Sequence, residues 1–449
     1  MNAFPQVASE VPALQTARWL LRPIAFMESC RRRYGATFGV HFLGFERPMF
    51  MLSDPEAIRA LFTAPEQGLP PGRTVALLPI MGPGSVLLLE GDEHLARRKL
   101  MLPPFHGQRM KAYEETVRDV AEREIDGWRS DRPFALHPRM QAVTLEVILK
   151  AVFGVADPLR GERLRELLRS LLSDTSSPLL QFRVLLARRL ERGDPLDELG
   201  RKTAEIDEIL LAEIAEHRGD PGSAEREDIL SLLVNARFED GTEMGDREVR
   251  DQLMTLLLAG HETTATALAW TFDLLLHDPA ALQRLRAELD AGSEDTYLRA
   301  VIAESLRLRP VVPLAGRRLV SDLNVEGLHL PAGTDVTPAI WLTHTRSDLY
   351  PEPYAFRPER FLEGAPSTYG WVPFGGGIRR CLGAAFAEME MRIVLRAVLE
   401  RCVLEPAEAR PERARRRNVT FSPRRGTLVR ARPRRVPARA SRPNLALVA

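Results

Sequence analysis

Cysteine is scarce in this chain, which has only Cys30, Cys381 and Cys402 among its 449 residues. An odd and sparse set argues against a disulfide framework and indicates a reducing compartment. Cys30 and Cys402 also lack the spacing of a zinc site, which needs several donors close together. Any chemistry of a cysteine here therefore depends on one residue without a cysteine partner.

Long hydrophobic runs are also missing. No stretch of about 18 uncharged apolar residues occurs, so the sequence predicts no transmembrane helix. The first residues, MNAFPQVASEVPALQTARWLLRP, do not place a charged start before a long apolar stretch. Without that pattern we expect neither a signal peptide nor a membrane anchor, and we expect a soluble, cytoplasmic protein.

Net charge is small, at +1, but it is unevenly distributed. From Arg410 to the end there are thirteen arginines and one acidic residue, Glu412. This basic end has almost no aromatic side chains that could stack on bases, so we expect no nucleic-acid binding. Residues 433–449 are predicted to form a basic, disordered tail.

The composition that remains is that of a globular protein, with 45% hydrophobic and 27% charged residues. The length suggests two domains or one large mixed fold. Residues 37–52 predict two strands around a turn, and residues 322–336 predict a hairpin. Helical patterns dominate from residue 114 to residue 289, with breaks at 171–180 and 217–228. The charged stretch between those breaks is either a mobile lid or a plain pair of surface helices.

The longest helical pattern covers residues 247–279 and is almost wholly apolar, which predicts a buried helix. Its centre nevertheless holds Gly260, Glu262 and Thr263. A glycine costs about 1 kcal/mol inside a helix relative to alanine, and buried polar groups need partners. Ala259 and Thr263 share a face. That face either makes room for a bulky polar group, or it is a tight helix crossing with threonines bonded to the carbonyl four residues earlier.

Two further patterns involve charged residues. Glu304 and Arg307 are three residues apart on a predicted helix and can form an ion pair. Arg360 lies in the loop sequence FRPERF. An arginine that meets a carboxylate already paired with Arg307 would lock this loop against the helix.

The stretch FGGGIRRCLG, residues 374–383, places Cys381 behind three glycines and before a predicted helix. A helix N-terminus and nearby arginines stabilise a thiolate. Glycines let the backbone approach a large flat group. A nucleophilic cysteine would need a histidine base, which the local stretch does not offer. An axial thiolate on haem iron needs one cysteine and no second protein ligand on that side. Both interpretations of Cys381 remain open at this point.

These motifs together resemble the cytochrome P-450 family. The haem-binding signature of that family is similar to the pattern of Phe374, Gly377, Arg379, Cys381 and Gly383. AGHETT at residues 259–264 resembles its oxygen-activating motif, and EHLARRK resembles its His-x-x-x-Arg pair through His94 and Arg98. The pairing of Glu304 with Arg307, and Arg360 in PERF, follow the family pattern in the same order. The resemblance covers residues 4–432 as a single haem-thiolate domain of the soluble bacterial type.

The resemblance implies a mainly α fold with smaller β-sheets, in which a long central helix lies over haem b (iron protoporphyrin IX) and the cysteine loop lies beneath. Cys381 is implied as the metal ligand, and Glu262, Thr263 and Gly260 as the catalytic residues that help deliver protons to oxygen. Glu304, Arg307 and Arg360 are implied as structural. The implied cofactor-binding residues are Cys381, His94, Arg98, Arg317, Arg379, Phe374, Gly377, Gly383 and Ala259.

The resemblance also implies a monooxygenase that inserts one oxygen atom of O2 into a hydrophobic molecule such as a fatty acid, terpenoid, steroid or polyketide. No flavin or iron–sulfur motif is present, so electrons would come from a separate ferredoxin or flavodoxin-type donor with its reductase. Arg379, Arg380 and Arg392 could form a docking face for that donor. We expect a monomer. The implied substrate-pocket residues are Val86, Leu87, Val311, Val312, Leu314 and Phe421.

Two other functions stay open on the sequence alone. One is a thiolate-haem isomerase or sensor that carries out no monooxygenation, which the Glu262–Thr263 pair disfavours. The other is a haem-free hydrolase with Cys381 as its nucleophile.

Overall fold

The fold is described from a computed structural model of the chain. It covers residues 4–64, 67–70, 78–107, 109–128, 132–154, 157–175, 197–292, 294–325, 327–364, 366–417 and 419–434. The predicted tail therefore lies almost wholly outside the described residues.

Helices make up most of the described chain. The α-helices are α1 (Pro12–Leu21), α2 (Pro23–Tyr34), α3 (Pro55–Thr63), α5 (Gly91–Met101), α6 (Arg109–Asp126), α7 (Leu136–Ala151), α8 (Pro158–Thr175), α10 (Asp197–Gly219), α11 (Ile229–Val234), α12 (Asp246–Leu276), α13 (Pro279–Ala291), α14 (Thr296–Leu308), α15 (Ile340–His344), α16 (Arg360–Glu363) and α17 (Ala384–Arg401). Short 3-10 helices are η1 (Pro103–Phe105), η2 (Pro221–Glu225) and η3 (Gly377–Arg379).

The strands of the described residues are short and form four small sheets. They are β1 (Thr37–Val40), β2 (Met49–Leu52), β3 (Gln67–Gly68), β4 (Phe134–Ala135), β5 (Arg317–Leu319), β6 (Leu323–Val325), β7 (Leu328–Leu330), β8 (Asp335–Pro338), β9 (Cys402–Pro406), β10 (Ala414–Arg417), β11 (Thr420–Pro423) and β12 (Leu428–Pro433). The largest sheet has the order β1-β2-β8-β5-β3. The predicted mainly α fold with smaller sheets is confirmed.

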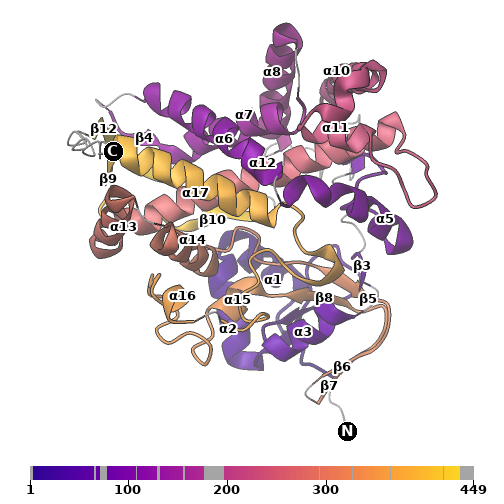
Figure 1. Cartoon of the computed structure of the whole chain (residues 1–449). Helices are drawn as coiled ribbons and strands as arrows, with labels where there is room; N and C mark the ends of the chain where they lie inside the picture. The colour runs from indigo at the N-terminus through magenta and orange to yellow at the C-terminus, as the bar shows by residue number, and fades with distance from the viewer. Residues whose placement is uncertain are drawn as a thin grey trace, which may run out of the picture.

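The largest sheet combines strands from the first 70 residues with strands from residues 317–338. β1 and β2 pair antiparallel, as the sequence predicts, while β2 pairs in parallel with β8 through Phe50 opposite Val336. Figure 1 shows this sheet in the lower part of the view with α2, α3 and α15, where indigo and orange segments lie together. The upper part is built from α6, α7, α8, α10, α11 and α17 around α12. The molecule thus has one part around the largest sheet and a second, mainly helical part that also contains the β4-β12-β9 sheet (Figure 1).

Other local predictions can be compared with the structure. The hairpin is confirmed as the antiparallel pair β6 and β7. The side chain of Asp54 caps α3 by accepting a hydrogen bond from the Glu56 amide at 2.9 Å. The first predicted helix break begins too early, because α8 continues to Thr175, and residues 176–196 lie outside the described chain. The second break is present as η2 between α10 and α11.

The hydrophobic core explains why α12 lies at the centre. Most side chains of this 31-residue helix are buried, including Trp270 and Phe272, which have no exposed surface. A helix that is apolar on nearly all sides must be surrounded by other elements. Among the described residues, no helix combines the length and the apolar character needed to cross a bilayer.

Candidate active site

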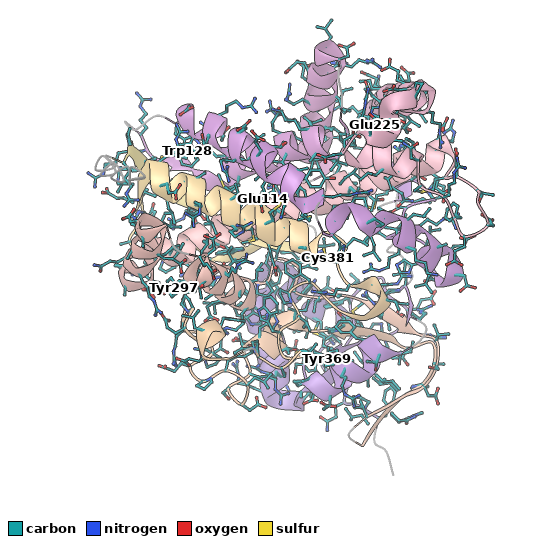
Figure 2. All side chains as sticks on the ribbon, in the orientation of Figure 1. Glu114, Trp128, Glu225, Tyr297, Tyr369 and Cys381 are labelled. Atoms are coloured by element: carbon teal, nitrogen blue, oxygen red, sulfur yellow. The ribbon has the colours of Figure 1, made fainter. Side chains whose placement is uncertain are left out.

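Cys381 lies between the two parts of the molecule, directly before α17. Figure 2 labels it near the middle of the view, where the helix begins. Its amide donates a hydrogen bond of 3.0 Å to the carbonyl of Phe374, which closes the loop between them. Gly375 and Gly377 have φ values of 66° and 65°, a left-handed conformation that favours glycine. Two of the three glycines are therefore required by the backbone path itself.

The third glycine is required by packing. A Cβ atom at Gly376 would lie 2.3 Å from Cδ2 of Phe62 on α3. The sequence interpretation gave all three glycines the task of approaching a flat ligand. The structure corrects this for Gly376, which packs against an aromatic ring of the protein.

The thiol of Cys381 is accessible to solvent, unlike the buried Cys30 and Cys402. Surrounding protein atoms still desolvate it, and this raises the pKa of the Cys381 thiol. The amide of Gly383 and the positive charges of Arg98 and Arg380 act in the opposite direction and favour the thiolate. Within the described residues no histidine hydrogen-bonds this thiol, so the base that a cysteine hydrolase requires is not seen.

The centre of α12 has one open face. Ala259 is exposed and Leu256 and Thr263 are partly exposed, although the residues before and after them on α12 are largely buried. These three residues are spaced to share a face of the helix. The Thr263 hydroxyl donates a hydrogen bond of 2.5 Å to the carbonyl of Ala259. Both interpretations of this segment therefore hold in part, because the face is open and the threonine is bonded to the preceding turn.

Gly260 lies on the side of α12 that faces α7. A Cβ atom there would come within 3.4 Å of Cδ1 of Ile148 on α7, which is close to an ordinary van der Waals contact. The catalytic role that the resemblance implies for Gly260 stays a prediction.

His94 on α5 is the centre of a cationic cluster. It is only 2% exposed, and its Nδ1 has no hydrogen-bond partner. Burial lowers the pKa of His94 to about 4, with further lowering from Arg379, Arg98 and Arg317. The structure therefore brings Arg317 and Arg379, which are far away in the sequence, to the His94–Arg98 pair of α5. A buried polar atom without a partner beside several positive charges fits an anionic group that is not part of the chain.

These features test whether the residues fit a haem. A haem-thiolate site needs a cysteine sulfur for the iron, cationic or hydrogen-bonding groups for the two propionates, and apolar surface for the ring. Cys381 offers an accessible sulfur, and His94 with its three arginines offers the anion site. The open face of α12 offers apolar surface. No cluster of three or more histidine, cysteine or acidic side chains suited to a metal occurs in the part of the chain described.

Glu304 and Arg307 form a fully buried ion pair on α14, each with 0% exposure. Two nitrogens of Arg307 donate to the two carboxylate oxygens at 2.6 and 2.7 Å. Arg360 adds a contact of 3.3 Å to the same carboxylate. Arg307 also donates to the carbonyls of Pro353 and Ala355 at 2.8 and 3.1 Å. The trio thus fastens the loop before α16 to α14.

His344 extends this network toward Cys381, and sequence reasoning did not find it. Its Nδ1 bonds the Arg307 carbonyl at 3.1 Å, and its Nε2 accepts from the Val372 amide at 2.9 Å. Burial lowers the pKa of His344 to about 3, so the ring is neutral and can donate with one nitrogen and accept with the other. Val372 in turn accepts from the Gly375 amide. A lone histidine far along the chain gave no signal for this role.

Glu262 points toward α7 and β10. It accepts a 2.6 Å hydrogen bond from Gln141 and lies 3.4 Å from Nη1 of Arg417 and 3.6 Å from Nε2 of His137. Burial raises the pKa of Glu262, while Arg417, Gln141 and Thr266 oppose the shift. The carboxylate is therefore held in a polar network beside the helix, next to Thr263 in sequence but on another side.

The residues proposed for the substrate pocket do not form one group. Val86 and Val311 are buried in the core around α12, and Phe421 is buried in a separate core with Trp19. The structure covers these three side chains with protein atoms. The partly exposed members of the set are Leu87, Val312 and Leu314.

The suggested docking face also needs correction. Arg392 is not a free positive charge, because it pairs with Glu114 at 2.8 Å and Asp295 at 2.9 Å. Arg379 donates a 2.7 Å hydrogen bond to the carbonyl of Leu89. Arg98 and Arg380 are the charges that act on the thiol of Cys381.

Comparison with known proteins agrees with these features. Residues 5–429 match the sequence model of the family described as "Cytochrome P450". The chain is 41% identical to "Putative cytochrome P450 135B1" of Mycobacterium tuberculosis, over 95% of this chain and 90% of that protein. It is 43% identical to "Putative cytochrome P450 137" of the same species, over 90% of this chain and 84% of that protein.

Solved structures show the same fold. The structure described as "Retinoic acid bound cyanobacterial CYP120A1" has a TM-score of 0.80 and 25% identity, and the match covers 96% of this chain and 100% of that one. The haem domain of "cytochrome P450DA" has a TM-score of 0.83 and 22% identity, over 97% of this chain and 99% of that one.

Proposed function

The chain belongs to the cytochrome P-450 family of haem b monooxygenases, and we propose that it oxidises a hydrophobic organic molecule with electrons from a separate donor. The substrate class is a fatty acid, terpenoid, steroid or polyketide-like molecule. The apolar residues Leu256 and Ala259 on the open face of α12 support this class. The cyanobacterial relative is described with retinoic acid bound, which is also a largely apolar molecule.

We further propose that residues 4–432 act as one haem-thiolate domain. Its electron donor would be a ferredoxin or flavodoxin-type protein with a reductase, and the enzyme would work as a monomer. Arg380 supports a donor with a negatively charged surface, because its side chain is exposed and its charge lies close enough to act on Cys381.

The residues of the chain would hold the cofactor as follows. Cys381 would bind the iron through its sulfur, since the Gly383 amide and two arginines favour the thiolate. His94, Arg98, Arg317 and Arg379 would bind the propionates. When bound, the haem supplies the activation of dioxygen that side chains alone do not provide.

Around the cofactor, the chain would orient substrate and move protons. Thr263 uses its hydroxyl hydrogen in the bond to Ala259, so its oxygen remains free to accept a hydrogen bond on the open face. Glu262 would take up protons, because its raised pKa brings the carboxyl closer to neutral pH. Glu304, Arg307, Arg360 and His344 would keep the Cys381 loop in place.

The observation that carries this proposal is the accessible Cys381, which no histidine of the described residues hydrogen-bonds, together with the buried His94 and the arginines around it. A reduced carbon monoxide difference spectrum tests it. The wild type should show the red-shifted Soret band of a thiolate ligand, and Cys381→Ala should lose it. Cys402→Ala is the matched control, since that thiol is buried elsewhere, and it should retain the band.

Turnover with O2 and a surrogate ferredoxin and reductase then tests the reaction. Oxygenated product from an apolar substrate that shifts the Soret band would support the proposal. Rearranged product without oxygen from O2 would favour the isomerase alternative, and a wild type without the thiolate band would contradict haem-thiolate chemistry altogether.

A further inference from the structure

The loop of residues 82–89 is attached to α12 by a row of polar contacts that the proposed function does not use. The amide of Gly84 donates to Oδ2 of Asp251 at 2.8 Å, and the amide of Val86 donates to Oε1 of Gln252 at 3.0 Å. Nε2 of Gln252 donates back to the Gly84 carbonyl at 2.5 Å. Three side-chain contacts to backbone thus fix the path of the loop.

A buried pair of hydroxyl groups completes the row. Ser85 and Thr255 have their oxygens 2.6 Å apart, and their exposures are 0% and 2%. The Thr255 hydroxyl also donates to the Asp251 carbonyl at 2.6 Å, so Ser85 is the donor of the pair. Buried polar groups are costly without partners, which means that α12 and the loop satisfy each other.

The loop sequence is adapted to this contact at one glycine in particular. Gly82 has a φ of 80°, and a Cβ atom there would lie 2.0 Å from Oδ1 of Asp251. The same Oδ1 accepts from Arg250, which also pairs with Asp207 on α10. The carboxylate of Asp251 is therefore fixed from both sides.

The other end of the loop reaches the cysteine side of the site. The carbonyl of Leu89 accepts a hydrogen bond of 2.7 Å from Arg379, two residues before Cys381. Thr255 lies one helical turn before Ala259 and on the same face. Between these anchors the loop passes from the open face of α12 to the loop that carries Cys381.

We propose that Asp251, Gln252 and Thr255 are positioning residues that hold the 82–89 loop as a rigid wall of the ligand space and so limit the size of the ligand admitted. The inference deepens the proposed function and rests on it, because the ligand space is that of the haem. A polar row that only stabilised the fold would not alter discrimination between small and large ligands.

The test uses ligand binding to the purified holoenzyme. Thr255→Val removes the hydroxyl and keeps the shape. The matched control is Thr271→Val on the same helix, since Thr271 also donates to the carbonyl four residues earlier and pairs with a serine, Ser305, at 2.8 Å. Dissociation constants for imidazole and for a bulky phenyl-substituted imidazole are measured from the Soret shift. We expect Thr255→Val to favour the bulky ligand relative to imidazole by about 5- to 10-fold, and Thr271→Val to leave the ratio unchanged.

A second variant changes the loop side of these polar contacts. Gly82→Ala leaves the sequence of α12 unchanged, but its added Cβ atom would displace the Asp251 side chain. It should shift the ratio of the two dissociation constants in the same direction. Gly91→Ala is its control, because Gly91 also has a positive φ, of 56°, but open space around it. Hydrogen exchange should become faster at the amides of Gly84 and Val86 in Thr255→Val and Gly82→Ala only.

The outcomes separate the two levels of the proposal. Unchanged exchange would show that the row does not fix the loop, and faster exchange with an unchanged binding ratio would show that the loop does not limit ligand size; either result overturns the inference. If Gly82→Ala does not retain haem, Thr255→Val decides alone. A wild type without the thiolate Soret band would instead contradict the proposed function.

Discussion

Single buried side chains in this protein depend on specific partners, and Glu262 is a clear case. Its carboxylate lies in a mostly protein environment, which raises its pKa. Arg417, with its Nη1 3.4 Å from Oε1, is the positive charge that opposes this shift. His137, whose pKa burial lowers to about 3, is neutral and adds no charge to the network. Arg417, from another part of the chain, is thus the main group that lowers the pKa of Glu262 against the effect of burial.

We predict that Arg417→Gln destabilises the protein more at high pH than at low pH. A carboxyl whose folded pKa is raised costs stability when ionised, and this cost is present above the folded pKa and disappears as the pH falls through it. Without Arg417 the folded pKa of Glu262 rises further, so the cost of ionisation grows by about 1 kcal/mol. Thermal unfolding of wild type and variant is compared across neutral and mildly acidic pH.

A double-mutant cycle gives the control for that experiment. In a Glu262→Gln background the effect of Arg417→Gln should be smaller and independent of pH, because no carboxylate remains to be balanced. A loss from Arg417→Gln that is the same at every pH in both backgrounds would refute the pairing.

At the scale of elements, the contact of α14 with residues 344–360 shows how burial changes the contribution of an ion pair to stability. Glu304 and Arg307 have the spacing of an ordinary surface pair, yet both are fully buried. Arg307 donates to carbonyls of three loop residues as well as to Glu304. A planar guanidinium can satisfy all of these acceptors at once, whereas an ammonium group cannot.

Arg307→Lys is therefore expected to cost about 3–5 kcal/mol of unfolding free energy, because a lysine cannot replace all the hydrogen bonds that Arg307 gives to the buried carboxylate and to the backbone carbonyls. Arg59→Lys is the matched control. Arg59 and Glu56 on α3 have the same three-residue spacing at 2.7 Å, but their side chains are about half exposed. Denaturant unfolding of the control should change by less than about 0.5 kcal/mol. Equal losses in the two variants would contradict the importance of burial here.

The sequence predicted those elements that depend on a local pattern of residues or on a short motif. The β6–β7 hairpin and the long buried helix both follow from neighbouring residues. Sequence reasoning missed His344, the packing of Gly376 on Phe62, and the contact of Ser85 with Thr255, which is 170 residues away. Pairing across such distances depends on the complete fold, so one sequence contains no local signal for it.

The pocket residues stay a prediction for a related reason. An apolar residue near a site can face the ligand or the core, and the residue type alone does not distinguish the two cases. Val311 and Phe421 illustrate this, because the Phe421 amide donates to the Val311 carbonyl while both side chains are buried. The assignment of Gly260 to the ligand side was undecidable in the same way.

At the scale of the whole molecule, the cofactor would contact separate parts of the chain. His94 on α5, Arg317 on β5 and Cys381 before α17 come from three separate elements. The buried Nδ1 of His94 has no hydrogen-bond partner among the described residues, and an anionic group could supply one. Haem binding should therefore contribute to the stability of the complete fold.

We expect the melting temperature of haem-depleted protein to rise with added haem, and to a smaller degree with iron-free protoporphyrin, which carries the same propionates. The gain from a ligand at 100 times its dissociation constant is about 2.7 kcal/mol. Arg98→Ala should reduce the gain from both molecules, whereas Cys381→Ala should reduce only the gain from haem. Equal gains for Arg98→Ala and wild type would remove the arginine from the propionate site.

The strand order of the largest sheet has a consequence for biosynthesis. β2 ends at Leu52, and its parallel partner β8 begins at Asp335. A ribosome must therefore add almost three hundred residues before β2 can find its neighbour. During that time one edge of the β1–β2 pair is unprotected, and an unpaired edge is a template for association with other chains. Shortened chains that end before β8 should accumulate in inclusion bodies or require chaperones, while the complete chain should close the sheet only after its last third has been made.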